Sequence, residues 1–354
     1  MTTVHISASR EYDVLIERGL IDRIGEETQK LSAKGRAVVV SGETVFPLYG
    51  PSVVSSLERA GFDVLTFIHP SGESAKSLSV YGKLLNFLCS SHISSTDFLF
   101  ALGGGVTGDL TGFAAATYLR GIKYIQIPTT LLAAVDSSVG GKTAINLDSA
   151  KNQAGCFYQP AAVFCDCDTL STLPPEQYRC GCAEIIKYGI LGDSSLFHAI
   201  SETPIKLREE SVISRCVEIK SQIVNEDEFD KGKRRLLNLG HTFAHAIEKN
   251  SGFSITHGDA VAIGTAVIAR AAVQMNICSE ETCNSIISLF RQYDLPTETS
   301  YTVPQLLEAV QSDKKIAGGK LHLIVPEEIG QCRIIPVQPD EIPRWMTCGG
   351  IRTE

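Results

Sequence analysis

Asp97-Phe-Leu-Phe-Ala-Leu-Gly-Gly-Gly-Val-Thr-Gly-Asp109 is the stretch of sequence that decides the fold. Its apolar start predicts a buried strand over residues 97–102, and residues 110–119 behind the glycines are helical in composition. Glycines at such a bend let backbone N–H groups approach a phosphate, where the helix dipole also favours negative charge. The stretch therefore predicts a phosphate-binding turn of an α/β fold, with a tight turn that holds no ligand as the alternative.

The same glycines formally match the dinucleotide fingerprint G-x-G-x-x-G, from Gly103 to Gly108. That fingerprint usually has an acidic partner about 20 residues later, but the corresponding region reads Ile127-Pro-Thr-Thr130. The match alone is therefore weak evidence for a nucleotide, and other strand ends have to support it.

Further short β-rich runs alternate with helical or glycine-rich stretches on both sides of this turn. They are residues 37–40, 62–68, 124–127 and 161–166. Such alternation is typical of a mostly parallel sheet wrapped by helices. We therefore expect an α/β fold class with a Rossmann-like N-terminal domain.

After Thr172-Leu-Pro-Pro175 the pattern changes to longer segments with helical periodicity. These segments are residues 183–191, 212–223, 236–249 and 260–275, and a small two-stranded element is expected at 321–326 and 332–337. A chain of 354 residues suits two domains of roughly 100 to 200 residues each. We predict an α/β domain at 1–172, a mainly helical domain at 173–354, and a ligand cleft at their boundary.

Composition excludes several classes of protein. Apolar residues make up 44% and charged residues 20% of the chain, which is a globular composition with no low-complexity excess. The net charge of −8 and the lack of a long basic run argue against a nucleic-acid partner. No apolar run reaches a membrane span, the start lacks a signal-peptide pattern, and the 11 cysteines form no C-x-x-C pair. We expect a cytoplasmic protein with no membrane partner.

Polar residues follow two other strands of the predicted sheet. Glu73 and Lys76 come after the strand at 62–68, and Thr129 and Thr130 come after the strand at 124–127. Open α/β sheets bind ligands at the carboxyl ends of their strands. Together with the glycine turn, these residues favour one long ligand, such as a dinucleotide, lying across neighbouring strand ends.

The helical half carries a possible metal site. His241 and His245 are four residues apart and so share one face of a helix, His257 follows after a short turn-like segment, and Glu184 sits in an otherwise apolar helix. Two histidines and a carboxylate with open positions suit a catalytic zinc ion. The alternative is that the helix histidines are half-exposed surface residues.

Several cations are concentrated near glycines or near Glu184 rather than spread over the chain. They are Lys142, Lys151 beside Asn152, Lys187, Lys220, Arg234 and the pair Lys314-Lys315. Each alone is most simply a solvated surface charge. As a group beside a metal, they indicate a polyanionic, oxygen-rich substrate.

In combination these strings resemble the dehydroquinate synthase family, from about residue 42 to residue 330. The resemblance rests on Gly103 to Asp109, on Val135-Asp-Ser-Ser-Val-Gly-Gly-Lys-Thr143, on Ala183-Glu-Ile-Ile-Lys-Tyr-Gly189 and on Leu237-Asn-Leu-Gly-His-Thr242. Lys151-Asn152, Thr172-Leu-Pro174 and Asp313-Lys-Lys315 add to it.

The resemblance implies roles for individual residues. A zinc or cobalt ion would be held by Glu184, His241 and His257. NAD would contact the glycine turn, the strand ends and the segments after them, namely Glu73, Lys76, Gly103, Gly104, Gly105, Asp109, Thr129, Thr130, Asp136, Ser137, Lys142, Lys151, Asn152, Thr169 and Thr172. Substrate binding and catalysis would use Asp136, Lys142, Lys151, Asn152, Lys187, Lys220, Arg234, Asn238, His245 and one of Lys314 and Lys315.

The implied reaction begins with a seven-carbon keto-sugar acid phosphate. A metal polarises a ring hydroxyl while NAD takes its hydride, phosphate leaves by elimination with the substrate phosphate itself as base, and the hydride then returns. Ring opening and an intramolecular aldol closure complete the carbocycle. The sequence departs from the family pattern at Gly42, Ala134, Gln177 and Ala244, which affects the expected cofactor affinity more than the reaction.

Three other functions stay open from the sequence. A polyol dehydrogenase would also need NAD, a metal and paired histidines, but would not need the cations Lys142, Lys151 and Arg234. Another sugar-phosphate cyclase is closer, although Arg234 as a carboxylate clamp favours an acid substrate. A catalytically inactive nucleotide sensor would not need all three metal ligands.

The resemblance also implies a homodimer in which Arg120 reaches the phosphate site of the neighbouring subunit. A helix running from about Val106 to Arg120 would be roughly 20 Å long at about 1.5 Å per residue, so Arg120 would lie far from its own glycine turn. The alternative is an exposed arginine at a helix end.

Overall fold

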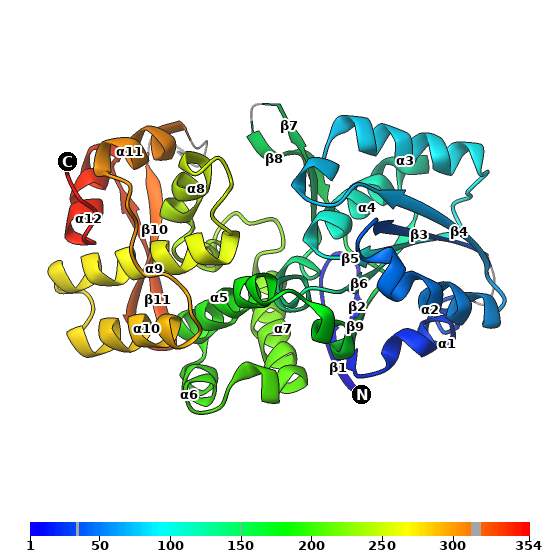
Figure 1. The fold of residues 1–354 in the computed structure, drawn as a ribbon, viewed down its shortest axis with the longest axis horizontal. Coiled ribbons are helices and arrows are strands. Elements are labelled where there is room, and N and C mark those ends of the chain that lie inside the picture. The colour runs from blue at the N-terminus through cyan, green and yellow to red at the C-terminus, as the bar shows by residue number, and fades with distance from the viewer. Residues whose placement is uncertain (33–34, 149, 313–319) are drawn as a thin grey trace. The chain divides into compact units, whose positions relative to one another are not determined.

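The computed structural model describes residues 1–32, 35–148, 150–312 and 320–354, which form two compact units (Figure 1). The first unit contains Met1–Pro174 and Glu209–Phe229, and the second contains Pro175–Arg208 and Asp230–Glu354. The predicted single boundary after residue 172 does not separate these two units, because residues 209–229 pack with the first unit. Apolar burial decides where that segment packs, and its position in the chain does not reveal it.

The first unit is built on a seven-stranded sheet in the order β1-β2-β9-β6-β5-β3-β4. All neighbouring strands are parallel except the antiparallel pair at the β1 edge. The strands are β1 (Thr2–Ile6), β2 (Tyr12–Glu17), β3 (Arg36–Gly42), β4 (Asp63–His69), β5 (Phe98–Gly103), β6 (Lys123–Pro128) and β9 (Ala162–Asp166). The predicted mostly parallel α/β sheet is therefore confirmed.

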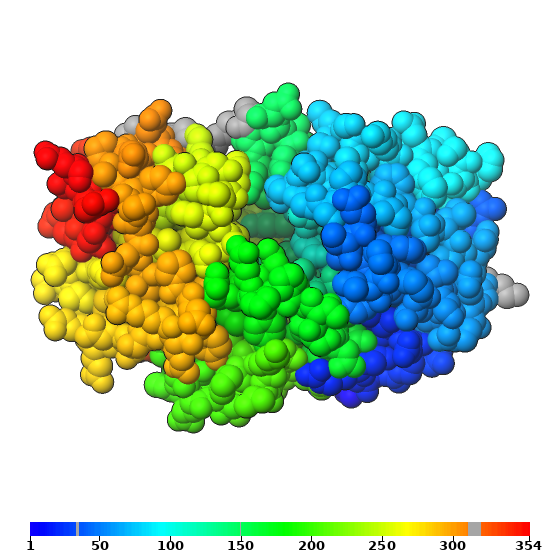
Figure 2. Space-filling model, in the orientation of Figure 1, coloured from blue at the N-terminus to red at the C-terminus, as the bar shows by residue number. Residues whose placement is uncertain are grey.

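Alternating side chains of these strands form two separate cores. Val39, Phe98 and Phe100 pack on one face with α1 (Ile24–Gln29) and α2 (Phe46–Arg59). Val38, Val40 and Leu99 pack on the other face with α3 (Leu78–Ser90) and α4 (Gly105–Thr117). Helices on both faces bury the central strands β3, β5 and β6 on both sides, which explains their continuous apolar runs. The outer surfaces of α2 and α3 appear in blue and cyan in Figure 2.

A second hairpin and one further helix complete the first unit. The antiparallel strands β7 (Lys142–Leu147) and β8 (Ala150–Phe157) form a two-stranded sheet that carries Lys142, Lys151 and Asn152. Helix α7 (Glu209–Glu226) packs against β1, β2 and the helical turn Ala133–Ser137.

The second unit is mainly helical, as predicted. Its helices are α5 (Pro175–Gly192), α6 (Ser194–Glu202), α8 (His241–Asn250), α9 (His257–Gln274), α10 (Glu280–Gln292), α11 (Val303–Ser312) and α12 (Ile342–Cys348). The predicted hairpin is present as β10 (Leu321–Glu328) and β11 (Gln331–Val337), and it packs against α5 and α9. None of the helices in the described residues combines the length and the apolar character that a membrane crossing needs.

Candidate functional site

Three side chains of the second unit converge on one point. Ligand atoms of Glu184, His241 and His257 all lie within 4.8 Å of one another, and they are the predicted metal ligands. Glu184 comes from the middle of α5 and is fully buried, whereas His241 and His257 are the first residues of α8 and α9. Glu184 Oε1 is 3.8 Å from His241 Nε2 and 3.4 Å from His257 Nε2.

The backbone turn before α8 explains why His241 points into this cluster. Gly240 has a left-handed φ of 76°, and a Cβ atom there would lie 2.4 Å from the Thr265 hydroxyl on α9. Only glycine therefore allows α8 and α9 to approach closely enough to bring their first residues together. His245, one turn further along α8, has its ring centre 5.6 Å from that of His241 and is not one of the three converging ligands.

Hydrogen bonds on the far side of each ring orient the two histidines. Nδ1 of His241 lies 2.9 Å from the carbonyl oxygen of Leu239, so an Nδ1–H donates there and leaves the Nε2 lone pair for the cluster. Nδ1 of His257 faces Glu248 Oε2 at 3.4 Å. Glu248 was missed by sequence reasoning, although it lies seven residues after His241 on the same helix.

The cluster attracts positive charge strongly. Burial lowers the pKa of His257, but hydrogen bonds and charges from Glu184 and Glu248 outweigh this and raise that pKa to about 10. A buried carboxylate and two imidazole nitrogens, with an oxygen acceptor facing the outer nitrogen of each ring, are a donor set typical of catalytic zinc. These residues therefore fit one divalent ion.

The other predicted residues of the second unit lie near these ligands in the chain. Lys187 is one turn from Glu184 on α5, is buried, and forms an ion pair with it. Arg234 is 2% exposed, and both Arg234 and Asn238 belong to the 3₁₀ helix Lys233–Asn238 that precedes α8. Lys314 and Lys315 lie outside the described residues, so their predicted role stays a prediction.

In the first unit the glycine turn has the shape of a cradle. The backbone N–H of Thr129 donates to the carbonyl oxygen of Gly103 at 3.0 Å, which joins β6 to the turn. A Cβ atom at Gly104 would lie 3.0 Å from the Thr130 side chain, and one at Gly105 would lie 2.9 Å from the Ser137 hydroxyl. The turn opens directly into α4, and a larger residue at Gly104 or Gly105 would crowd Thr130 or Ser137. Backbone N–H groups at such a helix start can meet the diphosphate of a nucleotide.

Lys76 connects predicted cofactor residues with the β7–β8 hairpin. This lysine is only 4% exposed, its Nζ donates to Asp109 Oδ2 at 2.6 Å and to Asn152, and Glu73 Oε1 lies 3.9 Å away. Burial raises the pKa of the Asp109 carboxyl, and the Lys76 ammonium partly offsets this. The structure thus brings Glu73, Lys76, Asp109 and Asn152 together.

Asp136 is paired with a lysine from much later in the chain. Lys220 on α7 donates from Nζ to the Asp136 carbonyl oxygen at 2.6 Å and to its carboxylate at 2.9 Å. Both residues belong to the first unit.

Thr169 and Thr172 lie in the 3₁₀ helix that follows β9, where the Tyr49 hydroxyl contacts both. The Thr169 hydroxyl donates to the carbonyl oxygen of Asp166 at 2.7 Å, so its proton is engaged in a hydrogen bond within the same turn. Tyr49 was missed by sequence reasoning, because nothing in α2 marks it as a partner of a turn more than a hundred residues later.

Arg120 does not lie in the helix that the sequence predicted for it. Helix α4 ends at Thr117, and Leu119 and Arg120 have left-handed φ values of 51° and 64°. Two successive non-glycine residues in this region cost roughly 1–2 kcal/mol each. Leu119 is nevertheless 51% exposed. The predicted helix is therefore too long by three residues, and Arg120 is presented on a strained turn.

Comparison with known proteins decides the family. Residues 66–180 match the 3-dehydroquinate synthase N-terminal family, and residues 181–316 match the 3-dehydroquinate synthase C-terminal family. The chain belongs to the 3-dehydroquinate synthase family. It is 40% identical over 348 residues to the 3-dehydroquinate synthase of Enterococcus faecalis (strain ATCC 700802 / V583), a match that covers 97% of each chain. It is 42% identical over 333 residues to that of Syntrophotalea carbinolica, covering 92% of each chain.

Solved structures of sugar-phosphate cyclases share the fold. A 2-deoxy-scyllo-inosose synthase complexed with carbaglucose-6-phosphate, NAD⁺ and Co²⁺ superposes with a TM-score of 0.89 at 25% identity, covering 98% of this chain and 99% of that one. The 2-epi-5-epi-valiolone synthase of Streptomyces hygroscopicus subsp. jinggangensis 5008, with NAD⁺ and Zn²⁺ bound, gives a TM-score of 0.86 at 25% identity, with the same coverage. A glycerol dehydrogenase from Schizosaccharomyces pombe shares the fold at 16% identity and a TM-score of 0.62, covering 95% of this chain and 88% of that one.

Proposed function

We propose that this chain converts 3-deoxy-D-arabino-heptulosonate 7-phosphate into 3-dehydroquinate and phosphate, with one zinc or cobalt ion and NAD as cofactors. The observation that carries the proposal is the convergence of Glu184, His241 and His257 in a chain 40% identical to named 3-dehydroquinate synthases. The reaction places the enzyme among carbon–oxygen lyases of the shikimate pathway, which leads to chorismate and the aromatic amino acids.

The cofactors are assigned to residues that fit them. Glu184, His241 and His257 would hold the metal, and the cradle of Gly103, Gly104 and Gly105 would hold the diphosphate of NAD. When bound, NAD accepts and returns a hydride and the metal polarises the hydroxyl that is oxidised. The Leu239 carbonyl oxygen and Glu248 orient the two histidine ligands, and Lys187 pairs with the Glu184 carboxylate.

The substrate contacts are assigned by charge. Arg234 is buried and always protonated, so it suits a carboxylate. Lys142, Lys151 and Asn152 on the β7–β8 hairpin are the candidates for phosphate and hydroxyl contacts, and His245 and Asn238 are the candidates for ring hydroxyls. Lys220 donates to one oxygen of the Asp136 carboxylate, and this carboxylate is the candidate acceptor for a hydrogen bond from a substrate hydroxyl or from the cofactor.

The same charges separate this function from its main rival. A glycerol dehydrogenase needs a metal and NAD, but its substrate carries no carboxylate or phosphate for Arg234, Lys142 and Lys151 to bind. In the proposed reaction the hydride is returned to the substrate within one catalytic cycle. NAD is therefore needed but not consumed.

We further propose a homodimer in which Arg120 acts on the neighbouring subunit's phosphate site. The strained, exposed turn at Leu119 and Arg120 supports this, because backbone strain is usually retained where it presents a functional side chain. The proposed compartment is the cytoplasm, where all the cysteines, which are free thiols in the structure, would stay reduced.

The test is to incubate the purified chain with the seven-carbon keto-acid phosphate, zinc and a trace of NAD. Free phosphate and dehydroquinate are expected in equal amounts, far exceeding any absorbance of NADH. A Glu184→Ala variant serves as the matched negative control. Stoichiometric NADH without phosphate would favour a polyol dehydrogenase, and phosphate with a neutral cyclitol product would favour another cyclase.

A further inference from the structure

Helix α7 lies in the first unit although the chain on both sides of it belongs to the second. We propose that Arg18 is a positioning residue that clamps the start of α7 and thereby sets Lys220 against Asp136. This inference rests on the proposed role of Asp136 and Lys220 in the site. Arg18 is more than a hundred residues away in the sequence from both Asp136 and Lys220.

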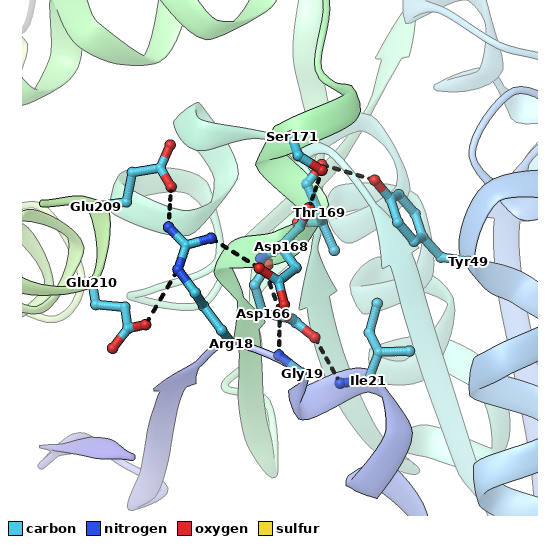
Figure 3. Close-up of polar contacts among 10 residues, drawn as sticks. All are labelled: Arg18, Gly19, Ile21, Tyr49, Asp166, Asp168, Thr169, Ser171, Glu209 and Glu210. Carbon is cyan, nitrogen blue, oxygen red and sulfur yellow. Dashed lines mark hydrogen bonds and ion pairs between the residues drawn. The ribbon is translucent and has the colours of Figure 1, made fainter. Parts of the chain in front are cut away.

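Arg18 contacts three carboxylates, two of them at the N-terminal end of α7 and one in the turn after β9 (Figure 3). Its Nη1 is 2.8 Å from Asp168 Oδ1, its Nη2 is 2.8 Å from Glu209 Oε2, and its Nε is 3.6 Å from Glu210 Oε1. Glu209 and Glu210 are the first two residues of α7, and Asp168 follows β9. One planar guanidinium therefore ties the first turn of the helix to the end of a sheet strand.

The backbone that carries Arg18 is itself held firmly. Asp166 at the end of β9 is 3% exposed, and its carboxylate accepts the N–H groups of Gly19 at 3.1 Å and Ile21 at 2.9 Å. Gly19 has a φ of 71°, which turns the chain sharply after Arg18. Arg18 thus projects from a turn whose backbone is hydrogen-bonded to the end of β9, as Figure 3 shows.

A second set of bonds holds the chain just beyond the other end of α7. Glu228 accepts the Ser9 N–H at 2.8 Å, the Ser9 hydroxyl at 2.6 Å and the Gln159 amide at 2.8 Å. Gln159 is 3% exposed and packs under the turn before Lys142, since a Cβ atom at Gly141 would lie 2.8 Å from it. Lys220 lies between these two ends.

The helix geometry makes such end contacts decisive for Lys220. A helix moves as one rigid element, so a slip along its axis displaces every side chain and a rotation about the axis re-aims every side chain. The apolar face of α7, which includes Val217 and Val224, decides the side that faces the sheet, but apolar attraction is non-directional. The directional bonds of Arg18 to the first turn fix the axial position at which Lys220 Nζ reaches both Asp136 oxygens.

The experiment compares five variants of the full chain loaded with NAD and zinc. They are Arg18→Met, Arg18→Lys, Lys220→Ala, the double variant Arg18→Met/Lys220→Ala, and Arg23→Met. Arg23 is the matched control, because it is a similarly exposed arginine of the first unit whose ion pair is with Glu17. Thermal unfolding of each variant measures whether the fold is intact.

Arg18→Met is expected to lower kcat/KM about tenfold, since misplacing a site residue by about 1 Å can cost up to a hundredfold. Arg18→Lys should recover most of the loss, and Arg23→Met should match the wild type. In the Lys220→Ala background, Arg18→Met should change kcat/KM less than twofold, because the clamp then has nothing to position.

The outcomes separate the clamp from the site. An unchanged kcat/KM for Arg18→Met, beside an impaired Lys220→Ala, would overturn the clamp and leave the proposed site standing. An equal tenfold loss in both backgrounds would show that Arg18 acts by another route, which also overturns it. Wild-type activity of Lys220→Ala would overturn the role of Lys220, and the clamp with it.

Discussion

Replacing Glu248 by glutamine is expected to weaken metal binding while leaving Glu184, His241 and His257 in place. Glu248 contributes no ligand atom to the cluster, but its carboxylate faces the outer nitrogen of His257. A carboxylate in this position orients the ring and makes its inner nitrogen a stronger donor. Glutamine keeps the size and an acceptor oxygen and removes only the charge.

The size of the effect follows from the contact itself. Hydrogen bonds to charged groups contribute about 1.5–3 kcal/mol, and those between neutral groups about 0.5–1.5 kcal/mol. The distance of 3.4 Å between Glu248 Oε2 and His257 Nδ1 is long, which favours the lower end of these ranges. We therefore expect Glu248→Gln to cost about 1–1.5 kcal/mol of metal binding, or about five- to twelvefold in Kd. Glu248→Ala, which also removes the acceptor, should lie within about ten- to a hundredfold.

The assay is a competition for zinc between the metal-free protein and a chromophoric chelator, repeated with cobalt by following its visible absorption. The matched control is Asp259→Asn, which removes the same charge two residues after His257 from a side chain whose Oδ1 lies 3.5 Å from Arg179 Nε. A Kd for Glu248→Gln within twofold of the wild type, or equal losses for both variants, would refute the assigned role of Glu248.

Three further outcomes are expected. Chelation should abolish turnover and added zinc or cobalt should restore it, and full activity in a preparation shown by elemental analysis to hold no metal would contradict the site. Arg120→Ala and Lys142→Ala are each expected to be nearly inactive. Refolded together they should recover about a quarter of wild-type activity, because about half of the dimers are mixed and one site of each mixed dimer is intact. Mixed dimers without recovered activity would place Arg120 in its own subunit's site or outside any site. Burial lowers the pKa of His69 below that of the unfolded chain, so the unfolded state binds its proton first and stability falls as the pH drops below about 6.5. The free energy of unfolding in urea should fall between pH 7.5 and 5.5 by up to about 1.4 kcal/mol less in His69→Gln than in the wild type. An equal fall in both proteins would contradict this.

Most of the sheet could be predicted because burial leaves a strong pattern. Strands β3, β5 and β6 are covered on both faces, so they read as unbroken apolar runs. Strands β1, β2, β7 and β8 were missed. The exposed faces of β1 and β8 carry polar residues such as Thr3, His5, Asn152 and Gln153. A half-exposed strand at an edge or in a hairpin resembles a loop in composition.

The metal ligands could be named from the sequence, but their geometry could not. His241 and His245 share a helix face, so spacing alone left both as candidates, and the structure brings His241 together with Glu184 and His257. The pairing of Lys220 with Asp136 depends on where α7 packs, which no local pattern encodes. The resemblance supplied both residues, whereas Arg18, Tyr49 and Glu248 became visible only through their contacts.

The return of α7 to the first unit has a consequence for synthesis on the ribosome. The sheet is complete once Pro174 has been made, but its covering helix ends at Glu226, after 34 residues that belong to the other unit. At a translation rate of about 5–20 residues per second, the surface beside β1 stays uncovered for roughly three to ten seconds. If the gene were divided at the family boundary between residues 180 and 181, the N-terminal fragment would lack α7 and this surface would stay uncovered. We expect such a fragment to bind chaperones or aggregate, and an added peptide of residues 209–229 to restore its solubility.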